Sequence, residues 1–393
     1  MADKYNKRGV SASKSEVHTA IAGLDKGLYP NAFCKILPDV STGNPEFVNL
    51  MHADTAGTKT VLSYLYWKEE NDLSVWSDVA QDALVMNLDD MGCVGAIDRI
   101  LVSSTIGRNK HLIPGEVLTE IIQGTARFAE KLKAYGVNLQ LAGGETADVG
   151  DVVRTIDIGF TTFARLAKAD LIVNAIKPGD IIIGLASYGQ ASYEDRYNSG
   201  IGSNGLTQAR HDVLDKRSER YPESFDPHTE AAYRFTGSYG LTDQVNLQGK
   251  DYEIGQLLLS PTRTYLPVLA ALLRSPVKSS IHGIIHNTGG GLTKVMKFVD
   301  QCRIVKDRLL PVPPVFELIQ QVSKAPLKEM HQVFNMGQRL EVYIPENQAN
   351  NVIDIVNDFN IDCQIIGYVE SAGINELVIS RDGDAWSYHP GEY

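Results

Sequence analysis

Three stretches of this chain share one pattern, in which an apolar run ends in a polar segment that contains glycine. The run 47–51 leads into the residues HADTAGTKT, the run 137–141 into AGGETAD, and the run 281–286 into NTGGG. Short apolar runs bounded by turn residues are typical of buried strands. The pattern therefore predicts strands that deliver charged groups and flexible backbone to their ends, and we place the candidate site there.

The segment after the first run has the groups that a polyphosphate needs. Gly57 would let backbone N–H groups approach anionic oxygens, Lys59 supplies a positive charge, and Asp54 can hold a divalent ion. The standard phosphate loop is excluded, because His52 stands where that motif requires glycine and Thr58 precedes the lysine. An ordinary strand exit with a solvated aspartate and lysine is the alternative interpretation.

A helix predicted over 76–94 places a carboxylate on its inward face. Its apolar stripe consists of Val79, Ala83, Met86 and Val94, and Asp90 lies on the same stripe. A buried carboxylate costs several kcal/mol unless it is paired, whereas Asp89 points about 100° away and is expected to be solvated. Asp90 is therefore either a buried ion pair or helix cap, or a metal ligand shared with Asp54.

The other two stretches add an acid and a glycine cluster. Gly143 and Gly144 precede Glu145, the third acidic candidate. Three consecutive glycines, 289–291, would each weaken a following helix by roughly 1 kcal/mol relative to alanine. Close approach of the backbone to a phosphate at the start of that helix explains them, and a tight structural turn is the alternative.

Alternating strands and helices in two halves predict an α+β fold with two domains, residues 1–170 and 171–393. The remaining helices are predicted over 15–24, 114–135, 261–274, 292–299, 314–322, 326–333 and 348–359, and the remaining strands over 100–104, 155–163, 181–186, 340–344 and 364–369. Residues 188–252 contain seven tyrosines and little periodicity. Long loops of this kind are usually functional or disordered, and we expect a lid or part of a dimer edge.

Charge and cysteine content exclude several classes of protein. The formal net charge of the 393 residues is -11, which disfavours a nucleic-acid or anionic-membrane surface. The four cysteines are too far apart in sequence for a zinc ribbon or redox pair, which favours a reducing compartment. The charged amino terminus and the absence of an apolar run of about 18 residues indicate a cytoplasmic protein without a membrane span.

These motifs together resemble the aminoimidazole ribonucleotide synthetase family, also called phosphoribosylformylglycinamidine cyclo-ligases. The family belongs to an ATP-dependent superfamily with selenophosphate synthetase and thiamine monophosphate kinase. Seven motifs match in order: Asp54 to Lys59, Asp89 and Asp90 with Gly95 and Ala96, Gly143 to Ala147, Ser203 to Gly205, Ser260 to Arg263, His286 to Gly291, and Phe334 to Gly337. The resemblance covers nearly all of the chain.

The resemblance implies a homodimer paired through amino-terminal domains, and a cyclisation of formylglycinamidine ribonucleotide that consumes ATP with Mg²⁺. It implies Mg²⁺ ligands at Asp54, Asp90 and Glu145, and catalytic roles for Lys59, Asp90 and His286. Further residues implied to bind ATP or the substrate phosphate are Asp54, Gly57, Thr58, Lys59, Gly143, Gly144, Glu145, Thr146, Ser203, Asn204, Gly205, Thr288, Gly289, Gly290 and Gly291. The alternative is that His286 is a structural residue, with its hydrogen bonds made at the end of a strand and no catalytic role.

The chain departs from the family pattern at several positions, including a glycine-rich loop expected near residue 30 that is replaced by Tyr29 to Phe33, and a longer segment 188–252. Thr55 and Ala56 replace a glycine and an apolar residue, Gly202 stands where the family usually has histidine, and Arg339 stands where it often has glycine. These departures leave open a divergent subfamily with another substrate. Another ATP-dependent small-molecule kinase or ligase of the superfamily, or a non-catalytic nucleotide-binding dimer, are the competing hypotheses.

Overall fold

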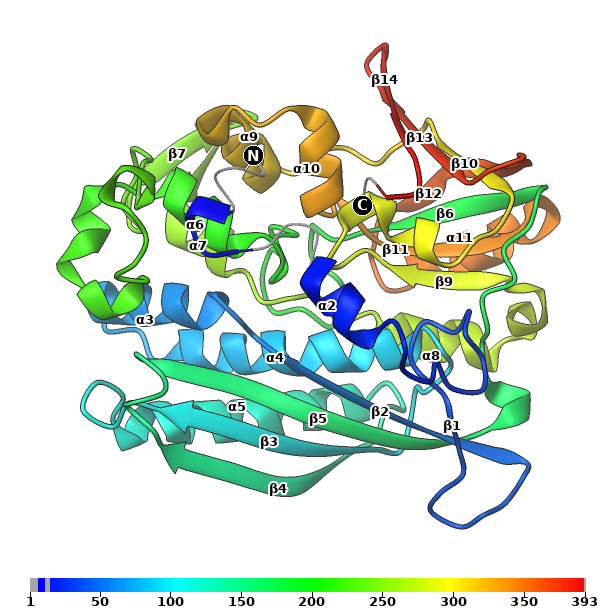
Figure 1. Ribbon diagram of the computed structural model, residues 1–393, viewed down its shortest axis with the longest axis horizontal. Coiled ribbons are helices and arrows are strands. Elements are labelled where there is room, and N and C mark those ends of the chain that lie inside the picture. Colours follow the sequence, from blue (N-terminus) through cyan, green and yellow to red (C-terminus); the bar gives the residue numbers. More distant parts are fainter. Residues whose placement is uncertain (1–5, 11–14, 392–393) are drawn as a thin grey trace.

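The computed structural model describes residues 6–10 and 15–391 as two mixed α/β halves that meet along one central helix (Figure 1). The first half holds a five-stranded sheet in the order β1-β2-β5-β3-β4. Its strands are β1 (Leu37–Pro38), β2 (Phe47–Thr55), β3 (Ile100–Arg108), β4 (Leu139–Asp148) and β5 (Ile156–Ala167). The pairing of β3 with β4 is parallel, and the other pairings are antiparallel.

The central helix is α4 (Ser74–Gly92), which follows α3 (Lys59–Glu70). It packs on β2 and β5 on one side, beside α5 (Gly115–Lys133), and on helices of the second half on the other side. This double cover explains why α4 is buried around nearly its whole circumference. Apolar residues fill the face toward the sheet, and the polar residues face the second half.

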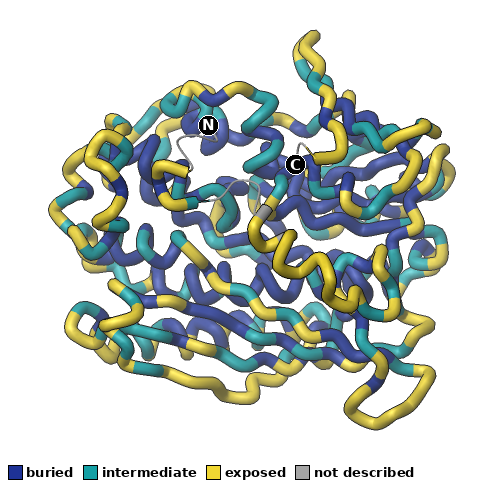
Figure 2. The backbone as a smooth tube through the Cα atoms, viewed as in Figure 1, coloured by how far each residue is buried: buried dark blue, intermediate teal, exposed yellow. Residues whose placement is uncertain are grey.

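No helix formed by the described residues covers the opposite face of the first sheet. Met51, Phe163 and Leu101 lie in one row across three strands, and the side chains of Met51 and Leu101 are 61% and 44% exposed. Figure 2 shows the exposed residues along this edge of the molecule, where β4 is exposed over most of its length.

The second half holds a seven-stranded sheet in the order β14-β13-β10-β12-β6-β11-β9. Its strands are β6 (Asp180–Ala186), β9 (Gly283–His286), β10 (Cys302–Lys306), β11 (Gln338–Pro345), β12 (Cys363–Ser371), β13 (Glu376–Arg381) and β14 (Asp384–Tyr388). Its helices are α6 (Leu206–Val213), α7 (Ile254–Leu259), α8 (Leu266–Arg274), α9 (Pro314–Ser323), α10 (Leu327–Val333) and α11 (Ala349–Asn357). Strand β6, which lies between β12 and β11, is buried throughout and is apolar after Asp180, as expected of a strand covered on both faces.

The tyrosine-rich segment 188–252 is folded, although it contains little regular structure besides α6. It holds three 3₁₀ turns between 216 and 233, and the hairpin of β7 (Gln244–Leu247) and β8 (Lys250–Glu253). Tyrosine and acidic side chains bind it to α3, with Tyr66 donating to Glu253 at 2.7 Å. The segment thus joins the two halves along α3.

The two-part α+β architecture predicted from sequence is confirmed, with differences at several element ends. The predicted strand 47–51 continues to Thr55, because pairing with β5 extends past Asp54. The glycine pair 143–144 lies inside β4 rather than in a turn, since pairing with β3 resumes at Gly144 after an irregularity at 142–143. Residues 261–265 are extended rather than helical, and residues 291–297 form a 3₁₀ helix, η6. No helix within residues 6–10 and 15–391 could cross a membrane.

Candidate active site

The polar face of α4 meets the extended segment 260–265 of the second half. Lys59 at the start of α3 is buried and forms an ion pair with Asp82, with 2.8 Å between Nζ and Oδ1. The same carboxylate accepts a bond from the backbone N–H of Thr262 at 2.7 Å, and Lys59 also donates to the carbonyl of Ser260. Burial lowers the pKa of Lys59, which the Asp82 charge opposes. The predicted phosphate-binding lysine therefore ties the two halves together.

Asp89 is buried, and the expectation that it is solvated is wrong. It accepts hydrogen bonds from the Thr264 hydroxyl at 2.7 Å and from the Tyr265 backbone N–H at 3.0 Å. Burial raises the pKa of Asp89 to about 7. The physical reason is the second half, which covers the side of α4 that a sequence-based view of an amphipathic helix assigns to solvent.

Asp90 does lie on an inward face, as predicted, and two histidines contact it. Its Oδ1 lies 2.7 Å from Nδ1 of His286, and its Oδ2 lies 3.4 Å from Nε2 of His52. Burial would raise the pKa of Asp90, but the bonds to His286 and His52 outweigh it and hold the pKa well below its usual range. The Asp90 side chain is 13% exposed, so it presents a fixed negative charge at a partly open position.

The protonation of His286 follows from its second partner. The Nε–H of Arg339 donates to Nε2 of His286 at 2.9 Å, so Nε2 accepts and the ring proton lies on Nδ1, facing Asp90. Burial lowers the pKa of His286 to about 4, which agrees with a neutral ring. With both nitrogens engaged and the side chain fully buried, His286 orients Asp90 in this arrangement.

Arg339 explains two departures from the family pattern at once. Its side chain is buried beside His286, and its guanidinium fills the space over Gly202. A Cβ atom at Gly202 would lie 2.0 Å from Nη1 of Arg339, far inside contact distance. A side chain at position 202 therefore requires the Arg339 guanidinium to move from the place that it holds here.

The three predicted Mg²⁺ ligands do not converge within one chain. Asp54 pairs with Phe160, which pairs with Ser104, which pairs with Gly144, so three strand spacings separate Asp54 from the strand of Glu145. At about 4.8 Å per spacing, their backbones lie roughly 14 Å apart. Glu145 is also one residue out of this row and faces the uncovered side of the sheet. Among the described residues no group of three His, Cys, Asp or Glu side chains could hold an ion.

The glycines fall into two groups, defined by what a Cβ atom would meet. Gly57, Gly143, Gly289 and Gly290 have open space, with no atom closer than 3.8 Å, and three of them have positive φ. A Cβ at Gly291 would lie 2.4 Å from the His331 carbonyl, at Gly205 2.5 Å from the Phe334 ring, and at Gly144 2.1 Å from the Ser104 carbonyl. The first group can approach a ligand, and the second permits close packing.

Hydroxyl and amide groups from both halves lie beside these open glycines. The hydroxyls of Thr58 and Thr207 are 2.5 Å apart, and those of Ser203 and Thr262 are 3.3 Å apart. The Asn204 side-chain amide is the nearest group to Gly289, at 3.9 Å from a built Cβ. Thr288 is buried next to His286, whereas Thr146 lies on the exposed strand β4 with Glu145. Most of the predicted residues thus come together, and those on β4 do not.

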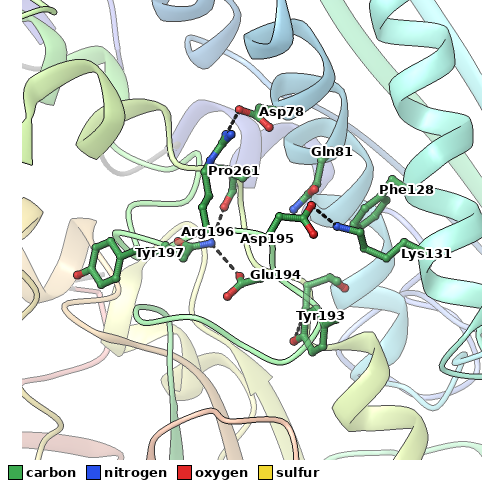
Figure 3. A pocket seen from close by; sticks show the side chains of 12 residues that line it. Asp78, Gln81, Phe128, Lys131, Tyr193, Glu194, Asp195, Arg196, Tyr197 and Pro261 are labelled. Atoms are coloured by element: carbon green, nitrogen blue, oxygen red, sulfur yellow. Dashed lines mark hydrogen bonds and ion pairs between the residues drawn. The ribbon is translucent and has the colours of Figure 1, made fainter.

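Residues 193–198 form a second bridge between the halves, which sequence reasoning missed. Figure 3 shows Asp195 facing Lys131 of α5 and Arg196 facing Asp78 of α4, with 2.6 Å between Asp195 Oδ2 and Lys131 Nζ. Glu194 pairs with the buried Arg263. These side chains surround a small cavity of about 80 Å³.

Asp82, Thr262, Thr264 and Arg339 were also missed as site residues. A signal existed for the acids, because Asp78, Asp82 and Asp89 recur at helical spacing on one face of α4. Arg339 was noticed only as a departure from the family pattern, since its contacts come from distant segments of the chain.

The donor set suits a nucleotide with a hard divalent cation. The carboxylates of Asp54 and Asp90 are oxygen ligands of the kind that Mg²⁺ prefers, and the bonds from His52 and His286 keep Asp90 ionised. Gly57, at φ +57° with open space above it, allows a phosphate to approach the backbone at the start of α3. The residues of one chain thus fit part of the predicted site for ATP and Mg²⁺.

Two family models and a curated relative match most of the chain. Residues 40–166 match the family model of the N-terminal domain of AIR synthase related proteins, and residues 177–380 match that of the C-terminal domain. The chain is 29% identical over 333 residues to the phosphoribosylformylglycinamidine cyclo-ligase of Methanocaldococcus jannaschii, which covers 84% of this chain and 81% of the relative.

Two solved structures share the fold at low identity. Thiamine monophosphate kinase from Aquifex aeolicus aligns with a TM-score of 0.51 at 13% identity, covering 95% of this chain and 97% of its own. PurL of T. maritima complexed with ADP aligns with a TM-score of 0.51 at 10% identity, covering 98% of this chain and 52% of its own. With both halves matched by its two domain models, the chain belongs to the family of AIR synthase related proteins.

Proposed function

We propose that this protein is a ligase that converts formylglycinamidine ribonucleotide to 5-aminoimidazole ribonucleotide in purine biosynthesis, with ATP converted to ADP and phosphate. The observation that carries the proposal is Asp90, an ionised carboxylate fixed between His52 and His286 where the two halves meet. The name of the archaeal relative supports the reaction, and the PurL complex with ADP supports the nucleotide.

The chemistry requires a poor leaving group to be made a good one. The formyl oxygen takes the terminal phosphoryl group of ATP, a ring-forming nitrogen then attacks the same carbon, and the oxygen leaves with the phosphate. Little covalent work falls to the protein, so positioning and charge neutralisation dominate the rate.

Different residues of this chain would carry out the positioning and the charge neutralisation. Asp54 and Asp90 would hold Mg²⁺, which when bound neutralises phosphate charge. Gly57 and Thr58 would bind ATP phosphates through the backbone and a hydroxyl. Lys59, through its pair with Asp82 and its bond to Ser260, would keep the start of α3 in place against the segment 260–265.

The glycine loop and the segment before α6 would bind the other phosphorylated ligand group. Gly289 and Gly290 have open space, and Gly289 faces Asn204, which follows Ser203. The backbone bond from Thr288 to His286 would hold this loop at the end of the strand. We assign His286 to orienting Asp90 rather than to direct proton transfer. Gly205 and Gly291 would shape the loops through close packing.

We also propose that Glu145 acts from a second copy of the chain. In one chain it is too far from Asp54 to share an ion, while β4 and the uncovered face of the first sheet remain exposed. A homodimer built on this face would cover Met51 and Leu101, and would bring Gly143, Gly144, Glu145 and Thr146 to the partner's site. Gel filtration combined with light scattering tests whether the protein is a dimer. We also propose that the protein is cytoplasmic, which cell fractionation tests.

The test of the function is release of ADP that depends on formylglycinamidine ribonucleotide and Mg²⁺ together. Asp90→Asn and Asp54→Asn should each lower turnover about 10²-fold or more, the magnitude seen when one preorganised electrostatic group is removed. Asp384→Asn, at an exposed strand position far from the site, is the matched control and should retain full turnover. Thiamine monophosphate serves as the competing acceptor. Turnover with that ester instead, or full activity of Asp90→Asn, would overturn the proposal.

A further inference from the structure

A cavity of about 360 Å³ opens beside Thr58, between α6, the turn that joins β4 to β5, and the folded segment 222–229. Its volume lies within the roughly 300–1,000 Å³ of typical small-molecule sites. Three arginines line it: Arg8, Arg154 and Arg210. The hydroxyls of Thr58 and Thr207 form part of the same wall.

Two of these arginines have carboxylate partners, and the third has none among the described residues. Arg8 pairs with Asp212 at 2.9 Å, and Arg154 pairs with Asp226 at 3.2 Å. Arg210 is 5% exposed, and its one hydrogen bond goes to the carbonyl of Ser224 at 2.8 Å. Its Nε–H is buried without a partner.

An unpaired buried guanidinium is costly, because burial removes its hydration without an opposite charge in return. Burial, together with the neighbouring charges of Arg8 and Arg154, lowers the pKa of Arg210 to about 9. The acids in the cavity wall are already engaged, Asp226 by Arg154 and Glu223 by the hydroxyl of Tyr64. Among the described residues no carboxylate forms an ion pair with Arg210, so its buried guanidinium has no opposite charge in direct contact.

The threonine pair adds a donor for the same kind of ligand. Thr58 and Thr207 hydroxyls lie 2.5 Å apart, so one donates to the other and the second hydroxyl proton stays available. Guanidinium and hydroxyl donors converging on one cavity are the groups that bind phosphate oxygens, since guanidinium can donate two parallel bonds.

We propose that this cavity binds a phosphate group of a small-molecule ligand, with Arg210 as its principal anion-binding side chain. Two sources share this chemistry: the phosphates of ATP, which would reach this cavity from Thr58, and the 5′-phosphate of a ribonucleotide, which would then bind here rather than at the 289–290 loop. The choice between them rests on the proposed function, whereas the phosphate site itself does not.

Binding of pyrophosphate, ribose 5-phosphate and ADP to the full chain in low-salt buffer, measured by calorimetry, tests the site. Arg210→Met should weaken at least one of these at least tenfold, and should leave the midpoint of thermal unfolding without ligand unchanged or higher, because an unpaired charge is removed. Arg308→Met, at an exposed position remote from the cavity, should bind like the wild type. Thr207→Val, a milder change in the same wall, should weaken binding severalfold and covers the case in which Arg210→Met fails to fold.

The ligands separate the two sources. Loss confined to ribose 5-phosphate assigns the ribonucleotide phosphate, and loss confined to ADP assigns the nucleotide. Unchanged binding of all three probes by both variants, or a lowered unfolding midpoint with unchanged binding, would show that Arg210 is only structural and overturn the proposal. Because binding is measured without turnover, Arg210-dependent binding in a protein that does not cyclise formylglycinamidine ribonucleotide would refute the proposed function alone.

Discussion

Gly202 and Arg339 provide a direct test of the packing at the centre of the site. In Gly202→Ala, the new methyl group would lie 2.0 Å from Nη1 of Arg339, whereas real Cβ contacts stay beyond 3.0 Å. The guanidinium must therefore move by about 1 Å or more. It has little freedom, because Nε is bonded to His286 at 2.9 Å and Nη2 lies 3.3 Å from the Met86 sulfur.

Two terms make up the expected cost of Gly202→Ala. Overpacking of a buried position costs about 1–3 kcal/mol. A side chain at the left-handed φ of Gly202 costs a further 1–2 kcal/mol, roughly. In the Arg339→Ala background the first term vanishes, since the guanidinium is gone, and only the backbone term stays. The two substitutions should therefore couple by about 1–3 kcal/mol in the stabilising direction.

Urea unfolding of the wild type, both single variants and the double variant measures this coupling. Gly57→Ala is the matched control, because Gly57 has a similar positive φ but no atom within 4 Å of a built Cβ. Its cost should be the same in the wild type and in the Arg339→Ala background. If Gly202→Ala costs the same in both backgrounds within about 0.5 kcal/mol, the contact does not constrain the site and the reasoning is wrong.

Two further predictions concern His331 and the glycine loop. His331 is fully buried, and neither of its ring nitrogens has a hydrogen-bond partner among the described residues. Burial lowers its pKa to about 3, so its contribution to stability is complete above pH 6.5 and is lost as the pH falls toward 3. Between pH 7 and pH 5 this loss is about 2 kcal/mol of unfolding free energy, and His331→Phe should remove that part of the pH dependence in denaturant titrations. Gly291→Ala, whose methyl group would meet the His331 carbonyl at 2.4 Å, should lower the unfolding free energy by about 2–5 kcal/mol. Gly289→Ala, with open space, should change it by less than about 1 kcal/mol while raising KM for a phosphorylated substrate, and equal stability losses at both positions would contradict the division of the glycines.

The sequence was sufficient for many of the strands and helices and for the inward position of Asp90, because hydrophobic periodicity reports which face of a helix is covered, but it missed α3 and strands β10, β13 and β14. It failed for Asp89, since periodicity assumes one buried face and α4 is covered on two. It also failed at Gly143 and Gly144, where local propensity favours a turn but pairing with β3 keeps the strand intact.

The remaining errors concern contacts between residues distant in sequence. No local pattern relates Arg339 to Gly202, although both were visible as departures from the family pattern, and only the structure places one in the space left by the other. The same holds for Asp82, whose partners Lys59 and Thr262 come from opposite halves.

The pairing of α4 acids with residues 260–265 has a consequence for recombination between relatives. In a hybrid protein joined at residues 171–179, each half would keep its own sheet, yet Asp82 and Asp89 would face whatever residues the donor has at the positions of Thr262, Thr264 and Tyr265. A working hybrid must therefore take α4 and the 260–265 segment from the same parent. Exchange of the halves at the junction between them in sequence would therefore separate α4 from the segment that it must match.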